Sequence, residues 1–109
     1  MSSVAKARPK TPGQEPPPPP PLILETTSQF DRDVKRQEKR GKSLDKLHAI
    51  IEILRNRRPL DRKHSDHPLS GEWKGWRDCH LEPDWVMIYR TDDVNLVLGR
   101  TGSHADLFD

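Results

Sequence analysis

The segment from Asp66 to Phe108 reads DHPLSGEWKGWRDCHLEPDWVMIYRTDDVNLVLGRTGSHADLF, and it decides the fold. It holds three strand-like runs, Trp76–Leu81, Trp85–Tyr89 and Val94–Leu98, rich in β-branched, aromatic and alternating residues. Glu82-Pro83-Asp84 separates the first two runs, and Thr91-Asp92-Asp93 separates the last two. Both are turn sequences of hairpin length, so this segment predicts an antiparallel meander.

The chain before this segment begins its folded part with a strand and a polar helix. Leu22–Thr27 is short, apolar and β-branched, and its position directly after a run of prolines suits a strand at a sheet edge. Ser28 is expected to cap a helix that runs to about Arg40, where Gly41 would end it. Its apolar face is thin, so we expect this helix to be stabilised either by packing at one spot or by a partner that covers it.

A second helix is predicted after Ser43, ended by Pro59. Its apolar residues recur at helical spacing and mark it as the main core helix: Leu44, Leu47, Ile50, Ile51 and Leu54. Together these elements predict an α+β fold, in which two N-terminal helices pack on one face of a small twisted antiparallel sheet.

The first 21 residues differ in composition from the rest. They hold most of the chain's eleven prolines, including the run Pro16–Pro21, and almost no large apolar side chains. Such a segment cannot bury enough surface to offset its ordering entropy. We therefore expect residues 1–21 to form a disordered proline-rich tail and residues 22–109 to form one domain.

Compartment and partner class follow from the cysteine content and the charge. One cysteine allows no internal disulfide, and neither an apolar membrane span nor an apolar leader precedes the domain, which favours the cytoplasm. Lysine and arginine outnumber aspartate and glutamate from Arg32 to Lys63, whereas the reverse holds from Asp66 to the end. A basic half beside a histidine-bearing half suggests an anionic partner, although the basic residues could also simply solvate two exposed helices.

Four residues at strand ends are candidates for chemistry: His80, Asp84, Arg100 and His104. His80 and Asp84 flank one tight turn, and the returning strand brings Arg100 and His104 back to the same end of the sheet. A carboxylate beside an imidazole fixes its tautomer, and a guanidinium stabilises charge on a phosphate. Four exposed loop residues without a common role are the alternative.

Two other kinds of site have weaker support. Three histidines and an aspartate could ligate zinc, but no close-spaced ligand pair is present, so no cofactor is expected. Cys79 is adjacent to His80 in a strand and therefore points to the opposite face, where core packing is the simpler role.

These motifs resemble those of YafQ-type toxins, in the RelE/ParE superfamily of type II toxin–antitoxin systems. The blocks H-P-L-x-G-x-W, D-x-H-x-E-P-D-W and R-T-G-x-H occur in this order, from His67 to His104. The resemblance implies ribosome-dependent endonucleolytic cleavage of mRNA without a metal, and a cognate antitoxin as partner. It also implies an active site made of His67, His80, Asp84, Trp85, Arg100, His104 and Phe108.

The implied chemistry uses the 2′-hydroxyl of the RNA as nucleophile. On this interpretation His80, oriented by Asp84, or else His67 is the base, His104 is the acid, and the two labels could be exchanged. Arg100 would steady the phosphate charge.

The remaining implied contacts are with RNA bases and ribosomal RNA. Trp85 or Phe108 could stack on a base, with core packing as the alternative for each, and the basic helices would hold ribosomal RNA phosphates. Two rival functions stay open: a related toxin that poisons a protein such as gyrase, and a non-catalytic RNA-binding module.

Overall fold

We describe residues 16–109 of the chain from a computed structural model; the N-terminal part of the expected tail, residues 1–15, lies outside the described residues. The elements along the chain are β1 (Ile23–Thr26), α1 (Ser28–Lys39), α2 (Leu44–Arg55), η2 (Arg62–His64), β2 (His67–Pro68), η3 (Gly71–Trp73), β3 (Arg77–Glu82), β4 (Trp85–Thr91), β5 (Asn95–Gly102) and α3 (His104–Phe108). Pro16–Pro21 are exposed and form neither helix nor strand.

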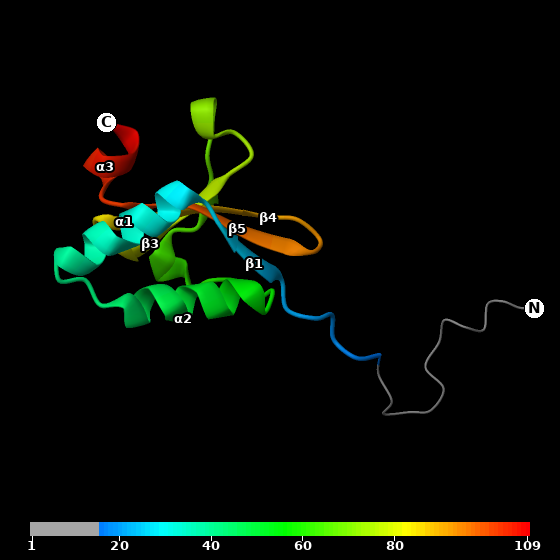
Figure 1. Ribbon diagram of the computed structural model, residues 1–109. Coiled ribbons are helices and arrows are strands. Elements are labelled where there is room, and N and C mark those ends of the chain that lie inside the picture. The colour runs from blue at the N-terminus through cyan, green and yellow to red at the C-terminus, as the bar shows by residue number, and fades with distance from the viewer. Residues whose placement is uncertain (1–15) are drawn as a thin grey trace, which may run out of the picture.

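The five strands form one sheet in the order β1-β5-β4-β3-β2 (Figure 1). The predicted meander is confirmed, because β3 pairs antiparallel with β4 and β4 pairs antiparallel with β5. The α+β class and the edge position of β1 are confirmed too.

The sheet is mixed, however, and not wholly antiparallel, since β1 pairs parallel with β5 from Ile23↔Asn95 to Thr26↔Leu98. No hairpin joins these two strands. The helices α1 and α2 and the strands β2, β3 and β4 lie between them in the chain, so turn chemistry does not dictate their relative direction.

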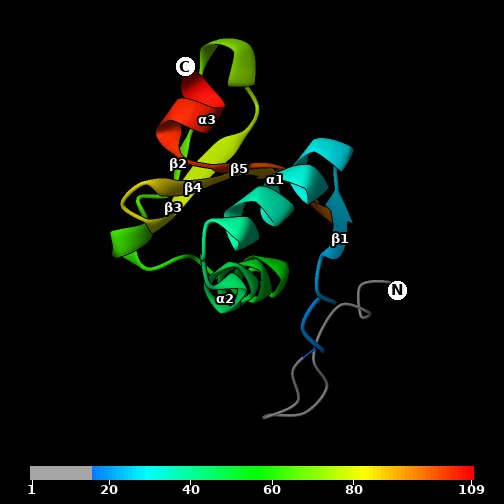
Figure 2. The same cartoon turned by 60° about the vertical axis from the view of Figure 1, so that its left-hand side comes forward.

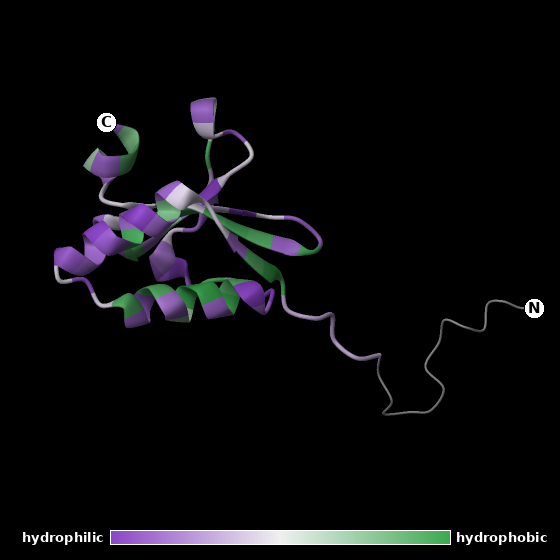
Figure 3. Cartoon of the chain, in the orientation of Figure 1, coloured by the Kyte–Doolittle hydropathy of each residue, from purple (hydrophilic) through white to green (hydrophobic). Residues whose placement is uncertain are grey.

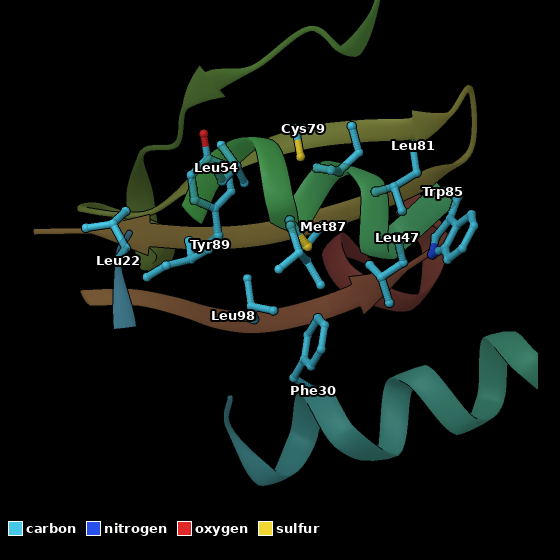
Figure 4. Packing of buried hydrophobic residues seen from close by; sticks show 13 residues of the cluster. Leu22, Phe30, Leu47, Leu54, Cys79, Leu81, Trp85, Met87, Tyr89 and Leu98 are labelled. Carbon is cyan, nitrogen blue, oxygen red and sulfur yellow. The ribbon is translucent and has the colours of Figure 1, made fainter. Parts of the chain in front are cut away.

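The main core lies on the sheet face that α2 covers (Figure 4). Leu47, Ile50, Ile51 and Leu54 of α2 are buried there as the helical spacing predicts. They pack against inward-facing strand residues, among them Cys79, Met87 and Tyr89, and against Phe30 of α1. Cys79 has no exposed surface, which confirms its predicted place in the core.

The first helix is as polar as predicted, and Figure 3 shows it mostly hydrophilic beside the more hydrophobic α2. Its cap is Thr27, whose Oγ1 accepts a hydrogen bond from the backbone N–H of Phe30 at 3.0 Å, because Ser28 is already helical. Unexpectedly, α1 also buries two polar side chains, Asp33 and Gln37.

A second, smaller apolar cluster lies on the opposite face of the sheet. Val86 and Ile88 of β4 meet Leu107 of α3 there, with Trp73 and Trp76 packed beside them. Figure 2 shows α3 on the side of the sheet away from α2. The helix α3 and the two-residue strand β2 were not predicted, and both border the site described next. No helix formed by residues 16–109 has the length and apolarity needed to cross a membrane.

Candidate active site

Strand register places the candidate residues on the sheet face opposite α2. Residues that pair across antiparallel strands project on the same face. His80 pairs with Val86, and Asp78 pairs with Ile88, so both share the face of the smaller apolar cluster. The Asp78–Ile88 pair continues on both sides across the sheet. His67 of β2 pairs with Asp78, and Arg100 of β5 pairs with Ile88.

His104 lies at the start of α3, beside the turn that carries Asp84. Its Nδ1 is 2.6 Å from Oδ1 of Asp84, and its backbone N–H donates to the same oxygen at 2.9 Å. The backbone hydrogen bond from His104 is the main reason that the pKa of Asp84 lies below its usual value. Because an ionised carboxylate only accepts, Nδ1 of His104 carries a proton and Nε2 is left for other partners.

His80 lies against this pair, with its ring centroid 5.2 Å from that of His104 and the planes at 83°. The structure therefore brings His80, Asp84 and His104 together, as their positions at strand ends predict. The partner expected for Asp84 was wrong, however, since Asp84 binds His104 and not His80. Gly102 pairs with Val86, which places the first residues of α3 directly beside the turn.

His67 forms a second imidazole–carboxylate neighbour pair. Its Nδ1 is 2.7 Å from the carbonyl oxygen of Ser65 and 3.0 Å from Oδ1 of Asp78. A carbonyl can only accept, so Nδ1 carries the proton in neutral His67 and Nε2 holds the lone pair. The latter is the nitrogen that a general base needs.

Asp78 is a site residue that the sequence interpretation missed. It is 3% exposed, and among residues 16–109 its Oδ1 accepts no well-aligned hydrogen bond, although His67 is close enough for an ion pair. Burial raises the pKa of Asp78, and the charges of His67, His80 and His104 oppose that rise. Its spacing of two from His80 in a strand was the available signal, because such residues share a face.

Arg100 is held by a carboxylate of α1. Its Nε donates to Oδ2 of Asp33 at 2.7 Å, and its Nη2 donates to Oδ1 at 3.2 Å. The Arg100 side chain keeps 22% of its surface exposed, whereas Asp33 keeps 1%. This partner was not anticipated, because Asp33 is distant in sequence and looks like an ordinary helix-surface charge.

The two aromatic candidates differ. Phe108 is 41% exposed, and its ring centroid is 6.1 Å from that of His104. Trp85 has no exposed surface, and its Nε1 donates to Oγ1 of Thr101 at 2.9 Å. Trp85 therefore lies in the core, which is the alternative that the sequence left open for it, and its stacking on an RNA base stays a prediction.

Two sets of contacts hold the short helix α3, which carries His104 and Phe108. Ser103 and Asp106 form a reciprocal capping box. The Asp106 carboxylate also receives hydrogen bonds from Nη1 and Nη2 of Arg40 at 2.6 and 3.2 Å. The hydrogen bond from Arg40 is the largest cause of the lowered pKa of Asp106. Gly102 permits the close approach of Asp106 to the backbone of β5, since a Cβ at position 102 would lie 2.9 Å from Cβ of Asp106.

Within the part of the chain that the structure describes, no group of three or more histidine, cysteine, aspartate or glutamate residues is arranged to hold a metal ion. The thiol of Cys79 is buried, and burial raises its pKa, so it remains protonated. The fold and these side chains define a small α+β protein with an imidazole, carboxylate and guanidinium site on one sheet face.

The family follows from sequence comparison. Residues 22–109 match the family model described as bacterial toxin of type II toxin-antitoxin system, YafQ. The chain therefore belongs to the YafQ toxin family. It is 46% identical over 86 residues to mRNA interferase toxin YafQ of Escherichia coli strain K12, covering 78% of this chain and 94% of that protein.

Solved structures agree with this assignment. The crystal structure of YafQ from Escherichia coli strain BL21(DE3) superposes with a TM-score of 0.78 at 44% identity, covering 81% of this chain and 99% of that one. The YafQ chain of the Escherichia coli DinJ-YafQ toxin-antitoxin complex gives a TM-score of 0.76 at 45% identity, covering 81% and 98%.

Proposed function

We propose that this chain is the toxin of a type II toxin–antitoxin system and that it acts as an mRNA interferase, an endoribonuclease that inhibits translation. The relative from strain K12 bears that name, and a relative of this fold forms a complex with DinJ. The observation that carries the proposal is the contact of His80 with the His104–Asp84 pair. Two imidazoles side by side, one of them held by a carboxylate, suit transfer of protons at a phosphodiester.

The chemistry proceeds through the RNA's own 2′-hydroxyl. A base removes the 2′-hydroxyl proton, O2′ attacks phosphorus, and the bond from phosphorus to O5′ breaks while an acid protonates O5′. The products are a 2′,3′-cyclic phosphate, which can open to a monophosphate, and a free 5′-hydroxyl. This route needs no side-chain nucleophile and no metal ion.

The contacts support a division of roles between the histidines. His104 acts as the acid, because the Asp84 carboxylate holds its Nδ1–H and leaves Nε2 free to carry a proton to the leaving oxygen. His67 or His80 acts as the base. Arg100 binds the charge that develops on the phosphate oxygens, and the exposed ring of Phe108 stacks on a base next to the cut.

The macromolecular partners follow from the surface. The exposed basic residues of α1, among them Lys35, Arg36 and Lys39, hold ribosomal RNA phosphates while the site reaches the message on the ribosome. A cognate antitoxin covers α1, whose outer face is polar, or enters the active site, or both. Action on ribosome-bound messages places the chain in the cytoplasm.

The decisive experiment replaces the 2′-hydroxyl at the cut position by hydrogen. The full chain is mixed with ribosomes programmed with a ribose message or with the matched deoxy-substituted message, with His104→Ala as the control protein. We expect cleavage of the ribose message alone, with a phosphate on the 3′ end. Cleavage of the deoxy message at the same position would refute the 2′-hydroxyl route.

A further inference from the structure

The carboxylate of Asp33 is the most completely enclosed charged group next to the site. It is 1% exposed, although most residues of α1 are exposed to solvent. Its oxygens accept four hydrogen bonds: from Nε and Nη2 of Arg100, from the backbone N–H of Thr101 at 3.1 Å, and from Nε2 of Gln29 at 3.0 Å. Burying a charge is costly unless it is paired, so this arrangement calls for a reason.

The geometry of the pair leaves half of the guanidinium unused. A guanidinium presents five N–H groups, which form one fork on its Nε–Nη2 side and another between Nη1 and Nη2. Asp33 occupies the first fork. Among residues 16–109, no hydrogen-bond acceptor for Nη1 of Arg100 is present, and the side chain retains 22% exposure. The second fork is therefore available to two oxygens of a phosphate.

The position of Arg100 relates this fork to the histidines. Arg100 pairs with Ile88, which also pairs with Asp78, and Asp78 pairs with His67. These residues form one row across the sheet, on the face that carries the imidazoles. An arginine on this row that was free to rotate would sample many directions, because its side chain is long and flexible.

We propose that Asp33 is a positioning residue for Arg100: it holds the guanidinium by one fork so that the other meets the phosphate in the transition state. The proposal rests on the proposed function and adds a residue to it. Fixed donors stabilise developing charge without reorganising during the reaction, which is the advantage that this contact supplies. The hydrogen bond that the backbone N–H of Thr101 donates to Asp33 suggests an alternative, purely structural role, in which Asp33 only connects α1 to β5.

The test is a double-mutant cycle on the full chain, read as the single-turnover rate on ribosome-bound message. The variants are Asp33→Asn, Arg100→Ala and the double variant. Asp31→Asn, an exposed change on the same helix, is the matched control. Removing Arg100 alone leaves a buried charge, so the folded fraction of each variant is measured by circular dichroism in assay buffer and each rate is expressed per folded molecule.

We expect Asp33→Asn to lower the rate on the order of 10- to 100-fold, as a displaced positioning contact does. On the Arg100→Ala background the same change should lower it less than twofold. Asp31→Asn should leave the rate unchanged. An equal loss from Asp33→Asn on both backgrounds would overturn the proposal, because a purely structural contact acts regardless of Arg100.

The control proteins separate this proposal from the proposed function. If the unaltered chain cleaves the message and Asp33→Asn cleaves at the rate of Asp31→Asn, the positioning role alone is refuted. If the unaltered chain cleaves no ribosome-bound message, the proposed function is refuted, and the role of Asp33 falls with it.

Discussion

One oxygen of Asp84 accepts two hydrogen bonds from His104, one from the backbone N–H at 2.9 Å and one from Nδ1–H of the ring at 2.6 Å. This double contact fixes both the position and the tautomer of the imidazole. Because the pKa of Asp84 is lowered, the carboxylate stays ionised across the neutral range and accepts the hydrogen bond from Nδ1–H of the ring. The proton on Nε2 of His104 is then the one that the ring can deliver to a leaving oxygen.

We expect Asp84→Asn to reduce the single-turnover cleavage rate on the order of 100-fold or more, since the acid loses its charged partner. Ribosome binding, measured by co-sedimentation, should not change, because the lost interaction matters in the transition state. Asp93→Asn, an exposed change in the β4–β5 turn, is the matched control. Equal rates for the two variants would show that His104 does not act through Asp84.

Trp85 and Phe108 should separate stability from activity. Trp85→Phe removes a buried hydrogen bond to Thr101 and leaves space in the core, so we expect a loss of about 1–3 kcal/mol in the free energy of unfolding from urea titration. Its rate per folded molecule should stay within about twofold of the unaltered chain.

Phe108→Ala should do the reverse, because its ring is 41% exposed. We expect little change in the urea midpoint and about a tenfold loss of cleavage, as expected when one stacked base contact is removed. A Trp85→Phe protein that is stable but inactive would mean that the indole contacts RNA after all.

The elements that the sequence predicted are those whose signals are local. The alternation in β3 to β5, the turn at Pro83 and the spacing of the α2 leucines each report on neighbouring residues. The parallel pairing of β1 with β5 depends on how a distant segment docks, and no local pattern encodes it. The helix α3 is five residues long, too short for a periodic pattern.

The sequence predicted which residues of the candidate site come together better than it predicted which of them bind each other. The turn at Asp84 and the exit of β5 predicted that His80, Asp84 and His104 would meet. Which histidine takes the carboxylate depends on the register of β5 against β4, which the sequence does not specify. The role of Asp33 could not be predicted either, because its partner Arg100 comes from a strand that is distant in sequence.

The contact of Arg40 with Asp106 should be needed to hold α3 in place. We expect Arg40→Ala to reduce cleavage several-fold, since His104 and Phe108 are carried by α3. The thermal midpoint should change little, because exposed ion pairs contribute little to stability. Arg58→Ala, which removes an exposed arginine that lies outside α1, is the control. Equal cleavage by both variants would mean that the capping box alone suffices to hold α3.

Asp78 should oppose folding at neutral pH while it supports catalysis. Burial raises the pKa of Asp78 in the folded chain above its ordinary value of 3.8, so the native state binds that proton more tightly than the unfolded state does. Stability from this group is therefore complete at low pH and is lost as pH rises through the folded-state pKa. Neutral Asn keeps the shape without the buried charge. Asp78→Asn should accordingly raise the urea midpoint at pH 7, and the gain should shrink as pH falls towards 4.

Two comparisons make this prediction specific. Asp92→Asn should behave with the opposite sign, because hydrogen bonds from the backbone of Val94 and Asn95 lower the pKa of Asp92, and its stabilising effect is present at neutral pH. Cleavage by Asp78→Asn should fall on the order of 10- to 100-fold, since the histidines lose a neighbouring negative charge. A variant that is less stable at pH 7 than the unaltered chain would show that the Asp78 carboxylate is paired and contributes to the fold. In that case the buried charge of Asp78 would not lower the stability of the fold for the sake of the active site.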